Sequence, residues 1–109
     1  MTSSNGLLNG KVAAITGGLT GIGRAIAIGF IEHGCKVAIN YLGGTGEANL
    51  LREMENQLEP YRSCFVNVAG DISKPGSGKA LVDRAVEEWG RLDIFVSNAG
   101  ICQFAEFLE

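Results

Sequence analysis

Short apolar runs alternate along the chain with longer segments of helical periodicity. Residues 11–16 (KVAAIT) and 36–41 (KVAINY) are apolar almost throughout, as is typical of parallel strands buried on both faces. Residues 62–68 alternate apolar and polar positions, and residues 92–97 (LDIFVS) form a fourth apolar run. The pattern predicts four strands.

Helices are predicted between these strands. The first covers residues 22–34 and ends at Gly34, the second covers 47–59 and ends before Pro60, and the third runs from a Ser73 N-cap to about Trp89. The inward-facing positions expected for the three helices are Ile22, Ile26, Ala27, Phe30 and Ile31; Leu51, Met54 and Leu58; and Val82, Ala85, Val86 and Trp89.

The alternation of strands and helices predicts an α/β fold. Strands joined by single helices pair in parallel through right-handed crossovers. We expect a Rossmann-type parallel sheet with strand order 3-2-1-4, flanked by helices and equivalent to a truncated half of a doubly wound fold. Residues 1–109 are expected to form one domain with a flexible N-terminus at 1–9.

The charge, the apolar runs and the cysteines of the chain disfavour several kinds of partner and cellular location. The net charge of −3, with Lys and Arg scattered, disfavours nucleic acid and anionic membrane as partners. No apolar run approaches the roughly 20 residues of a spanning helix, and residues 1–10 do not resemble a signal peptide. Cys35, Cys64 and Cys102 fit no metal motif. We expect buried or half-buried thiols, no metal and a cytoplasmic location.

A glycine-rich segment, residues 16–23 (TGGLTGIG), joins the first strand to the first helix. Gly17 allows a tight turn, Gly21 leaves room for a pyrophosphate near the backbone, and Gly23 allows the helix to pack closely on the strand. Free N–H groups at the helix start suit a diphosphate. A tight turn without a ligand is the alternative, and a P-loop is excluded because no G-x-x-x-x-G-K-[ST] follows the strand.

The end of the second strand bears on the choice of dinucleotide. An acidic residue there holds the ribose hydroxyls of NAD, but the strand ends Asn40-Tyr41 and no Asp or Glu precedes Glu47. We therefore expect NADP rather than NAD. Because the usual Arg is also missing, Asn40, Thr45 and loop N–H groups are the expected cradle for the 2′-phosphate, and NAD stays open.

Two more motifs follow the third and fourth strands. They are Gly70-Asp71-Ile72 and Ser97-Asn98-Ala99-Gly100. Together with residues 16–23, the chain resembles the N-terminal half of a short-chain dehydrogenase/reductase, with Ser97 where that family has Asn. The G-L-L-N-G-K-V opening and the closing residues from S-N-A-G-I-C to F-A-E-F-L-E resemble fungal sugar dehydrogenases of the L-rhamnose 1-dehydrogenase kind.

The resemblance implies a set of cofactor-binding residues. Ile22 would lie along the pyrophosphate, Asp71 would accept a hydrogen bond from the adenine amine, Ile72 would pack on the adenine, and Asn98 with Ala99 would line the adenosine ribose. Alternatively, Asp71 is only a loop carboxylate and Asn98 only a turn residue. The implied set is Gly17, Leu19, Thr20, Gly21, Ile22, Gly23, Asn40, Asp71, Ile72, Asn98, Ala99 and Gly100.

The same resemblance implies that catalysis lies elsewhere. The family's Asn, Ser and Tyr-x-x-x-Lys would follow Glu109, and neither Tyr41 nor Tyr61 has a Lys four residues on. We expect no catalytic residue within these 109 residues and no activity from them alone. The parent activity implied is NADP(H)-dependent oxidoreduction of an alcohol or carbonyl, including a sugar.

Two other functions are weighed against this one. A non-catalytic nucleotide-binding or interaction module would pair with a second copy or a full-length relative through the exposed edge of the fourth strand, residues 92–96. An enzyme with new chemistry would have to use Cys102, for which no base is evident. His33 is expected only to cap the first helix.

Overall fold

A four-stranded parallel sheet forms the centre of the computed structural model, which describes residues 7–44 and 46–98. The strands pair in the order β3-β2-β1-β4, and every pairing is parallel. This confirms the predicted fold class and strand order. The strands are β1 (Val12–Ile15), β2 (Lys36–Tyr41), β3 (Phe65–Ala69) and β4 (Ile94–Val96).

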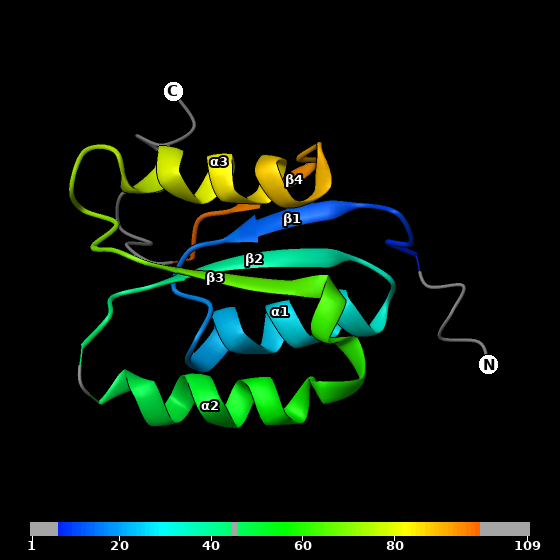
Figure 1. Cartoon of the computed structure of the whole chain (residues 1–109), viewed down its shortest axis with the longest axis horizontal. Helices are drawn as coiled ribbons and strands as arrows, with labels where there is room; N and C mark the ends of the chain where they lie inside the picture. Colours follow the sequence, from blue (N-terminus) through cyan, green and yellow to red (C-terminus); the bar gives the residue numbers. More distant parts are fainter. Residues whose placement is uncertain (1–6, 45, 99–109) are drawn as a thin grey trace.

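Helices cover both faces of the sheet (Figure 1). Helices α1 (Gly21–Glu32) and α2 (Glu47–Gln57) lie on one face, and α3 (Ser77–Trp89) lies on the other. The chain passes from β1 to β2 and β3 on one side, and then returns to place β4 on the other side of β1. In open α/β sheets, ligands bind beyond the carboxyl ends of the strands at such a reversal.

The central strands supply most of the core. All four residues of β1 are at most 2% exposed, because helices pack on both faces of this strand. On the α1 and α2 face, Ile15 and Ile39 pack with Ile31 and Met54. Each large apolar side chain removed from water stabilises the fold by roughly 1.5–3 kcal/mol.

The opposite face of the sheet is built from smaller side chains. Ala14 and Ala38 from the sheet pack with Leu81 and Ala85 from α3. All four side chains are fully buried. Small residues let helix α3 lie close to the strands, because little side-chain volume separates the two layers.

The predicted start of the third strand is wrong. Residues 59–64 form a 3₁₀ helix, η2 (Glu59–Cys64), so that β3 begins at Phe65 rather than at residue 62. Pro60 lies in the first turn of η2, where its fixed φ and missing N–H are tolerated. η2 is interrupted at Tyr61, whose φ of −119° and ψ of 27° are not helical, so the chain makes two short tight turns between α2 and β3.

The third helix also differs from its prediction. Helix α3 begins at Ser77 instead of following a Ser73 N-cap, because Gly76 adopts a φ of 92° just before it. Pro75 contributes as well, since a residue that precedes proline is disfavoured in a helix. The predicted inward face of α3 is confirmed at Ala85, which is fully buried, and at Trp89, which packs against the same cluster. It is wrong at Val86, which is 43% exposed, and it missed Leu81, which is fully buried.

One residue of the first predicted helix face points the other way. Ile22 is 65% exposed, whereas Ala27 and Ile31 are buried against the sheet as expected. The first turn of α1 projects beyond the end of the sheet, so an apolar side chain there has no core to enter. Gly34 has a φ of 95° directly after the helix, which confirms the predicted stop.

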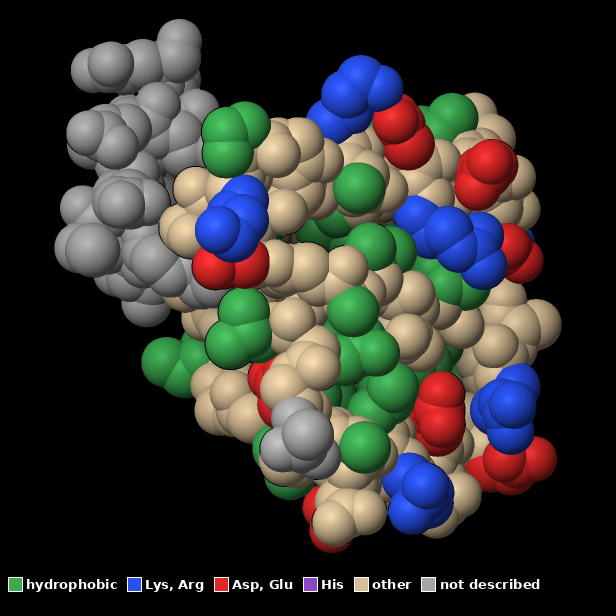
Figure 2. Space-filling view, turned by 60° about the vertical axis from the view of Figure 1, so that its left-hand side comes forward, with side chains coloured by type: hydrophobic (Ala, Val, Ile, Leu, Met, Phe, Trp, Pro, Cys, Tyr) green, Lys and Arg blue, Asp and Glu red, His purple; other side chains and the backbone are tan. Residues whose placement is uncertain are grey.

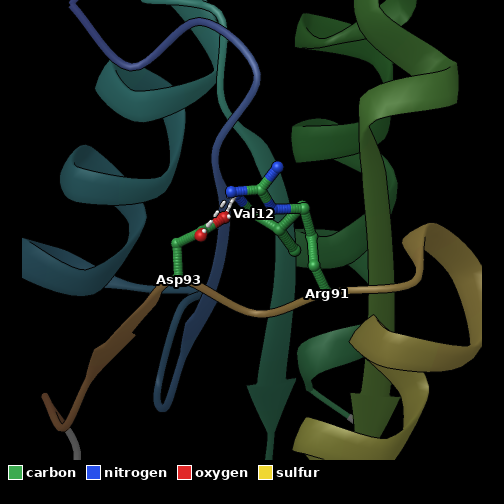
Figure 3. Close-up of polar contacts among 3 residues, drawn as sticks. All are labelled: Val12, Arg91 and Asp93. Atoms are coloured by element: carbon green, nitrogen blue, oxygen red, sulfur yellow. Dashed lines mark hydrogen bonds and ion pairs between the residues drawn. The ribbon is translucent and has the colours of Figure 1, made fainter.

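Asp93 fastens the beginning of β1 to the beginning of β4 (Figure 3). Its carboxylate accepts a hydrogen bond from the Val12 N–H at 2.9 Å, and its own N–H donates to the Val12 carbonyl at 2.8 Å. The Arg91 guanidinium donates to both carboxylate oxygens at 2.9 and 2.8 Å. These hydrogen bonds hold the pKa of Asp93 below its usual value, with the larger contribution from Arg91 and a smaller one from Val12.

We expect Asp93→Asn to lower the Tm at neutral pH and to have a smaller effect in acid. Because the folded-state pKa is depressed, the ionised carboxylate stabilises the fold above the ordinary aspartate pKa of about 3.9. That stabilisation is lost as pH falls through the folded-state pKa. Circular dichroism melts of both proteins between neutral and acidic pH measure the difference.

Asp83→Asn is the matched control for this experiment. It removes one carboxylate from an exposed pair with Lys79 on α3, and such pairs contribute little to stability. Equal Tm losses in the two variants at neutral pH would contradict the role assigned to Asp93.

Candidate functional site

A cleft of about 180 Å³ lies beyond the carboxyl ends of β1, β2 and β3. It is bordered by the glycine loop after β1, the loop after β2 and the loop after β3. This is the position at which the reversal of strand order predicts a ligand. The lining residues are Gly17, Leu19, Thr20, Asn40, Tyr41, Leu42, Glu47, Gly70, Asp71 and Ile72.

The amino end of α1 carries backbone N–H groups that no side chain of the described residues caps. Thr20 occupies the N-cap position, but its side chain makes no capping hydrogen bond, and the first turn holds no acidic residue. Gly21 has a φ of 55°, and a Cβ added there would meet nothing within 4 Å. The helix start therefore combines a partial positive charge with open space beside it.

Gly23 is the point of closest approach between α1 and the loop that precedes it. A Cβ at this position would collide with the Gly17 carbonyl and would lie 2.6 Å from the Asn98 side-chain nitrogen. The close approach predicted for this glycine is confirmed, but its partner is the loop residue Gly17 and not the strand β1. The colliding atoms of Gly17 belong to the backbone, so the rotation of a side chain cannot relieve the collision.

We expect Gly23→Ala and Gly29→Ala to change stability in opposite directions. The first forces the loop after β1 away from α1 and should cost about 1–3 kcal/mol. The second has nothing within 4 Å of its added Cβ, and should gain roughly 0.5–1 kcal/mol because alanine favours the helix. Urea unfolding of each variant measures the free energy, and a stabilising Gly23→Ala would contradict the close approach.

Two asparagine side chains hold the peptide groups of Gly17 from opposite sides. The Asn40 carbonyl oxygen accepts the Gly17 N–H at 3.4 Å, and the Asn98 amide donates to the Gly17 carbonyl at 3.2 Å. Asn40 lies in β2 and Asn98 follows β4, so both neighbours of β1 position the glycine loop.

Asn40 also reaches the third loop of the cleft. Its side-chain amide donates to the Gly70 carbonyl at 2.8 Å, and its backbone carbonyl accepts the Gly18 N–H at 3.0 Å. The residue is only 3% exposed. Its side chain is thus engaged in joining two loops, whereas the sequence placed it against a cofactor phosphate.

We expect Asn40→Leu to destabilise the fold by roughly 1–3 kcal/mol, because it leaves two half-buried backbone groups, the Gly17 N–H and the Gly70 carbonyl, without their side-chain partner. Asn40→Asp should cost less, since it keeps the acceptor for the Gly17 N–H while setting an oxygen against the Gly70 carbonyl. Urea unfolding measures both effects. Asn56→Leu, at an exposed position of α2, is the control, and an equal effect there would contradict the role of Asn40.

Asp71 begins the loop after β3. Its carboxylate accepts hydrogen bonds from the Ser73 hydroxyl at 2.6 Å and from the Ser73 N–H at 2.9 Å. These two bonds lower the pKa of Asp71, the hydroxyl contributing most. Both use the same carboxylate oxygen, so the other oxygen receives no hydrogen bond from the described residues. An ionised acceptor therefore borders the cleft.

Glu47 is the residue of the cleft that the sequence interpretation missed. Although it opens α2, its side chain turns back and accepts the N–H groups of Gly43 at 2.6 Å and Gly44 at 2.9 Å. A carboxylate is therefore present at the loop after β2. The expectation of NADP assumed that this loop has no carboxylate, and it did not take Glu47 into account. The available signal was an acidic residue three positions after a glycine pair.

The expected cofactor residues fall into three groups. Six line the cleft, although Leu19 is also 2% exposed and packs into the core. Four others belong to the start of α1 or contact the glycine loop without lining the cleft. Ala99 and Gly100, like Thr45 and Cys102, lie outside the described residues. The six are Gly17, Leu19, Thr20, Asn40, Asp71 and Ile72, and the four are Gly21, Ile22, Gly23 and Asn98.

The two described cysteines lie away from the cleft. Cys35 is buried, and burial raises the pKa of its thiol to about 11, so it is a poor nucleophile. Cys64 is half-buried. Within residues 7–44 and 46–98, no three His, Cys, Asp or Glu side chains are grouped to hold a metal ion, and none of the helices there could cross a membrane.

Comparison with known proteins places this arrangement in a family. Residues 11–109 match the family described as short chain dehydrogenase. The chain belongs to the short-chain dehydrogenase family. This confirms the family that the three sequence motifs indicated, and the cleft lies where members of this fold bind dinucleotides.

Two curated relatives are L-rhamnose dehydrogenases. The chain is 50% identical over 104 residues to L-rhamnose-1-dehydrogenase of Scheffersomyces stipitis, covering 95% of this chain and 40% of that one. It is 44% identical over 103 residues to L-rhamnose 1-dehydrogenase (NAD(P)(+)) of Sphingomonas sp., covering 94% and 39%. The chain thus spans about two-fifths of the length of these relatives.

A solved structure shows the same fold with a cofactor. The blue fluorescent protein from a metagenomic library, in complex with NADPH, superposes with a TM-score of 0.77 at 32% identity. The match covers 85% of this chain and 37% of that one. The parallel sheet and its flanking helices are therefore those of a Rossmann-fold dehydrogenase of this family.

Proposed function

We propose that the cleft binds a nicotinamide adenine dinucleotide, with the diphosphate at the amino end of α1. The observation that carries this proposal is the set of N–H groups in the first turn of α1, which no described side chain caps and beside which Gly21 leaves open space. Anions bind at such helix ends because the N–H groups and the helix dipole both favour negative charge.

The adenosine half would lie between the loops after β2 and β3. Asp71 offers an ionised oxygen to the adenine amine, and Ile72 offers an apolar surface in the same cleft. Ile22, 65% exposed beside the helix start, would cover the diphosphate. Asn98, Ala99 and Gly100 would border the ribose, as the resemblance to the family implies.

NADP(H) is the cofactor that we propose, because the last residues of β2, Asn40 and Tyr41, carry no carboxylate and only Glu47, from the next helix, brings one to this loop. The NADPH of the blue fluorescent protein structure supports this choice. NAD(H) is the second candidate, because Glu47 brings a carboxylate to the same loop. The name of the Sphingomonas relative includes NAD(P)(+).

The activity proposed for the whole protein is oxidoreduction of an alcohol or carbonyl, with a sugar as substrate class. The support is the sequence identity of 50% and 44% to two L-rhamnose dehydrogenases. When bound, the nicotinamide supplies the hydride acceptor or donor. The residues of this chain would bind and orient the adenosine and diphosphate, and the acid–base residues are proposed to lie beyond Glu109.

A second candidate function is association through the sheet edge. The strand order β3-β2-β1-β4 places β4 at one end of the described sheet. Such an edge can accept a strand from another chain. A second copy or a full-length relative is the proposed partner in this case.

We expect the chain to bind NADP⁺ saturably and Gly21→Asp to weaken that binding at least about tenfold. Aspartate tolerates a positive φ better than most residues, and its charge suits the start of a helix, so the fold should be kept. The same charge would lie where the diphosphate binds and would repel it. Isothermal titration calorimetry measures the affinity, and thermal melting checks the fold.

Gly78→Asp is the control for this variant. It adds the same charge to the first turn of α3, where a Cβ also meets nothing within 4 Å. Loss of affinity in both variants alike, or a wild-type chain with no saturable affinity for NADP⁺ or NAD⁺, would contradict the proposed function.

A further inference from the structure

The loop after β2 is closed by a carboxylate that belongs to the next helix. One oxygen of Glu47 accepts the N–H groups of both Gly43 and Gly44, at 2.6 and 2.9 Å. Gly43 has a φ of 97°, which turns its peptide toward the same oxygen as that of Gly44. The two backbone donors of this loop that would suit a phosphate are therefore already occupied by a negative charge.

The second oxygen of Glu47 is placed differently. It receives no hydrogen bond from the described residues, and Glu47 lines the same cleft as Asp71, Leu42 and the glycine loop. Its position is thus fixed by the first oxygen, while the second stays available as an acceptor. A hydroxyl group in the cleft could donate a hydrogen bond to this second oxygen.

The charges around the cleft add to this effect. Two of its lining residues, Glu47 and Asp71, are acidic, and none is Lys or Arg. Arg52 of α2 lines a neighbouring pocket with Gly43 and Gly44, where it donates to Asn49 at 3.5 Å, and it does not line the cleft itself. Figure 2 shows acidic and basic side chains interspersed around hydrophobic ones on the face drawn, without a basic stripe.

We propose that Glu47 determines the relative affinity for NAD and NADP, by accepting the ribose 2′-hydroxyl of NAD and repelling the 2′-phosphate of NADP. This inference rests on the proposed function of the cleft. A 2′-phosphate would have to displace Glu47 from the Gly43 and Gly44 amides or lie beside its charge. Like charges brought together at a binding site cost affinity, whereas a hydroxyl pairs with a carboxylate.

Glu47 is a specificity residue that its position in the sequence conceals. It comes six residues after the end of β2 at Tyr41, on the far side of the loop. It reaches the loop because helix α2 starts there and its first side chain points back along the chain. The hydrogen bonds to Gly43 and Gly44 fix this orientation before any ligand binds.

The test compares three variants of the chain by isothermal titration calorimetry with NADP⁺ and NAD⁺. Glu47→Gln removes the charge but keeps an oxygen that can accept the Gly43 and Gly44 amides. Glu47→Asp keeps the charge on a shorter side chain. Glu53→Gln removes the same charge from an exposed position of the same helix. The pair 2′,5′-ADP and 5′-AMP repeats the comparison with the adenosine half alone.

We expect Glu47→Gln to lower the ratio of the NADP⁺ to the NAD⁺ dissociation constant about tenfold. Glu47→Asp and Glu53→Gln should each leave that ratio within about twofold of the wild type. The 2′,5′-ADP to 5′-AMP ratio should fall in parallel for Glu47→Gln. Thermal melting confirms that each variant is folded at the temperature of titration.

The outcomes separate this inference from the function on which it rests. Wild-type binding with an unchanged ratio in Glu47→Gln, or a change matched by Glu53→Gln, overturns the role of Glu47 and leaves the cleft as a dinucleotide site. No saturable binding of either dinucleotide by the wild type overturns the proposed function and this inference together.

Discussion

The geometry of the cleft depends on how the backbone of one residue, Gly17, is held between two strands. Its N–H is bound by Asn40 from β2, and its carbonyl is bound by Asn98 after β4. Gly23 packs directly against the same carbonyl, so the start of α1 cannot move independently of this loop. The helix that offers its N–H groups to an anion is therefore positioned by side chains on both sides of the central strand.

Much of the fold could be predicted from the sequence because its signals are local. Strand β2 has the predicted bounds, and Gly34 stops α1 as expected. A run of apolar residues and a glycine after a helix can each be recognised from a few neighbouring positions in the sequence. The beginning of β3 and the inward face of α3 could not be predicted in this way. Whether residues after Pro60 continue as a 3₁₀ helix, and whether Leu81 or Val86 meets the sheet, depends on the packing of distant segments.

In the candidate site, too, the local features could be predicted from the sequence and the contacts between distant residues could not. The glycine spacing identified the loop and the helix end, because each glycine answers a local need for a turn or a close approach. The side-chain partners of Asn40 are 23 and 30 residues away, so sequence could name this residue but not what it contacts. Glu47 was passed over because it was judged by its place after β2, whereas its side chain folds back to that strand's loop.

The alanines between the sheet and α3 affect the position of a loop that borders the cleft. Ala14, Ala38 and Ala85 are fully buried where α3 meets the sheet, so the helix packs close to β1 and β2. The loop that carries Asp71 leads directly into α3, and the Ser77 hydroxyl at the helix start donates to the Asp71 carbonyl at 2.7 Å. Because this hydrogen bond joins the loop to the start of α3, we expect a larger side chain in place of one of these alanines to displace Asp71 together with the helix.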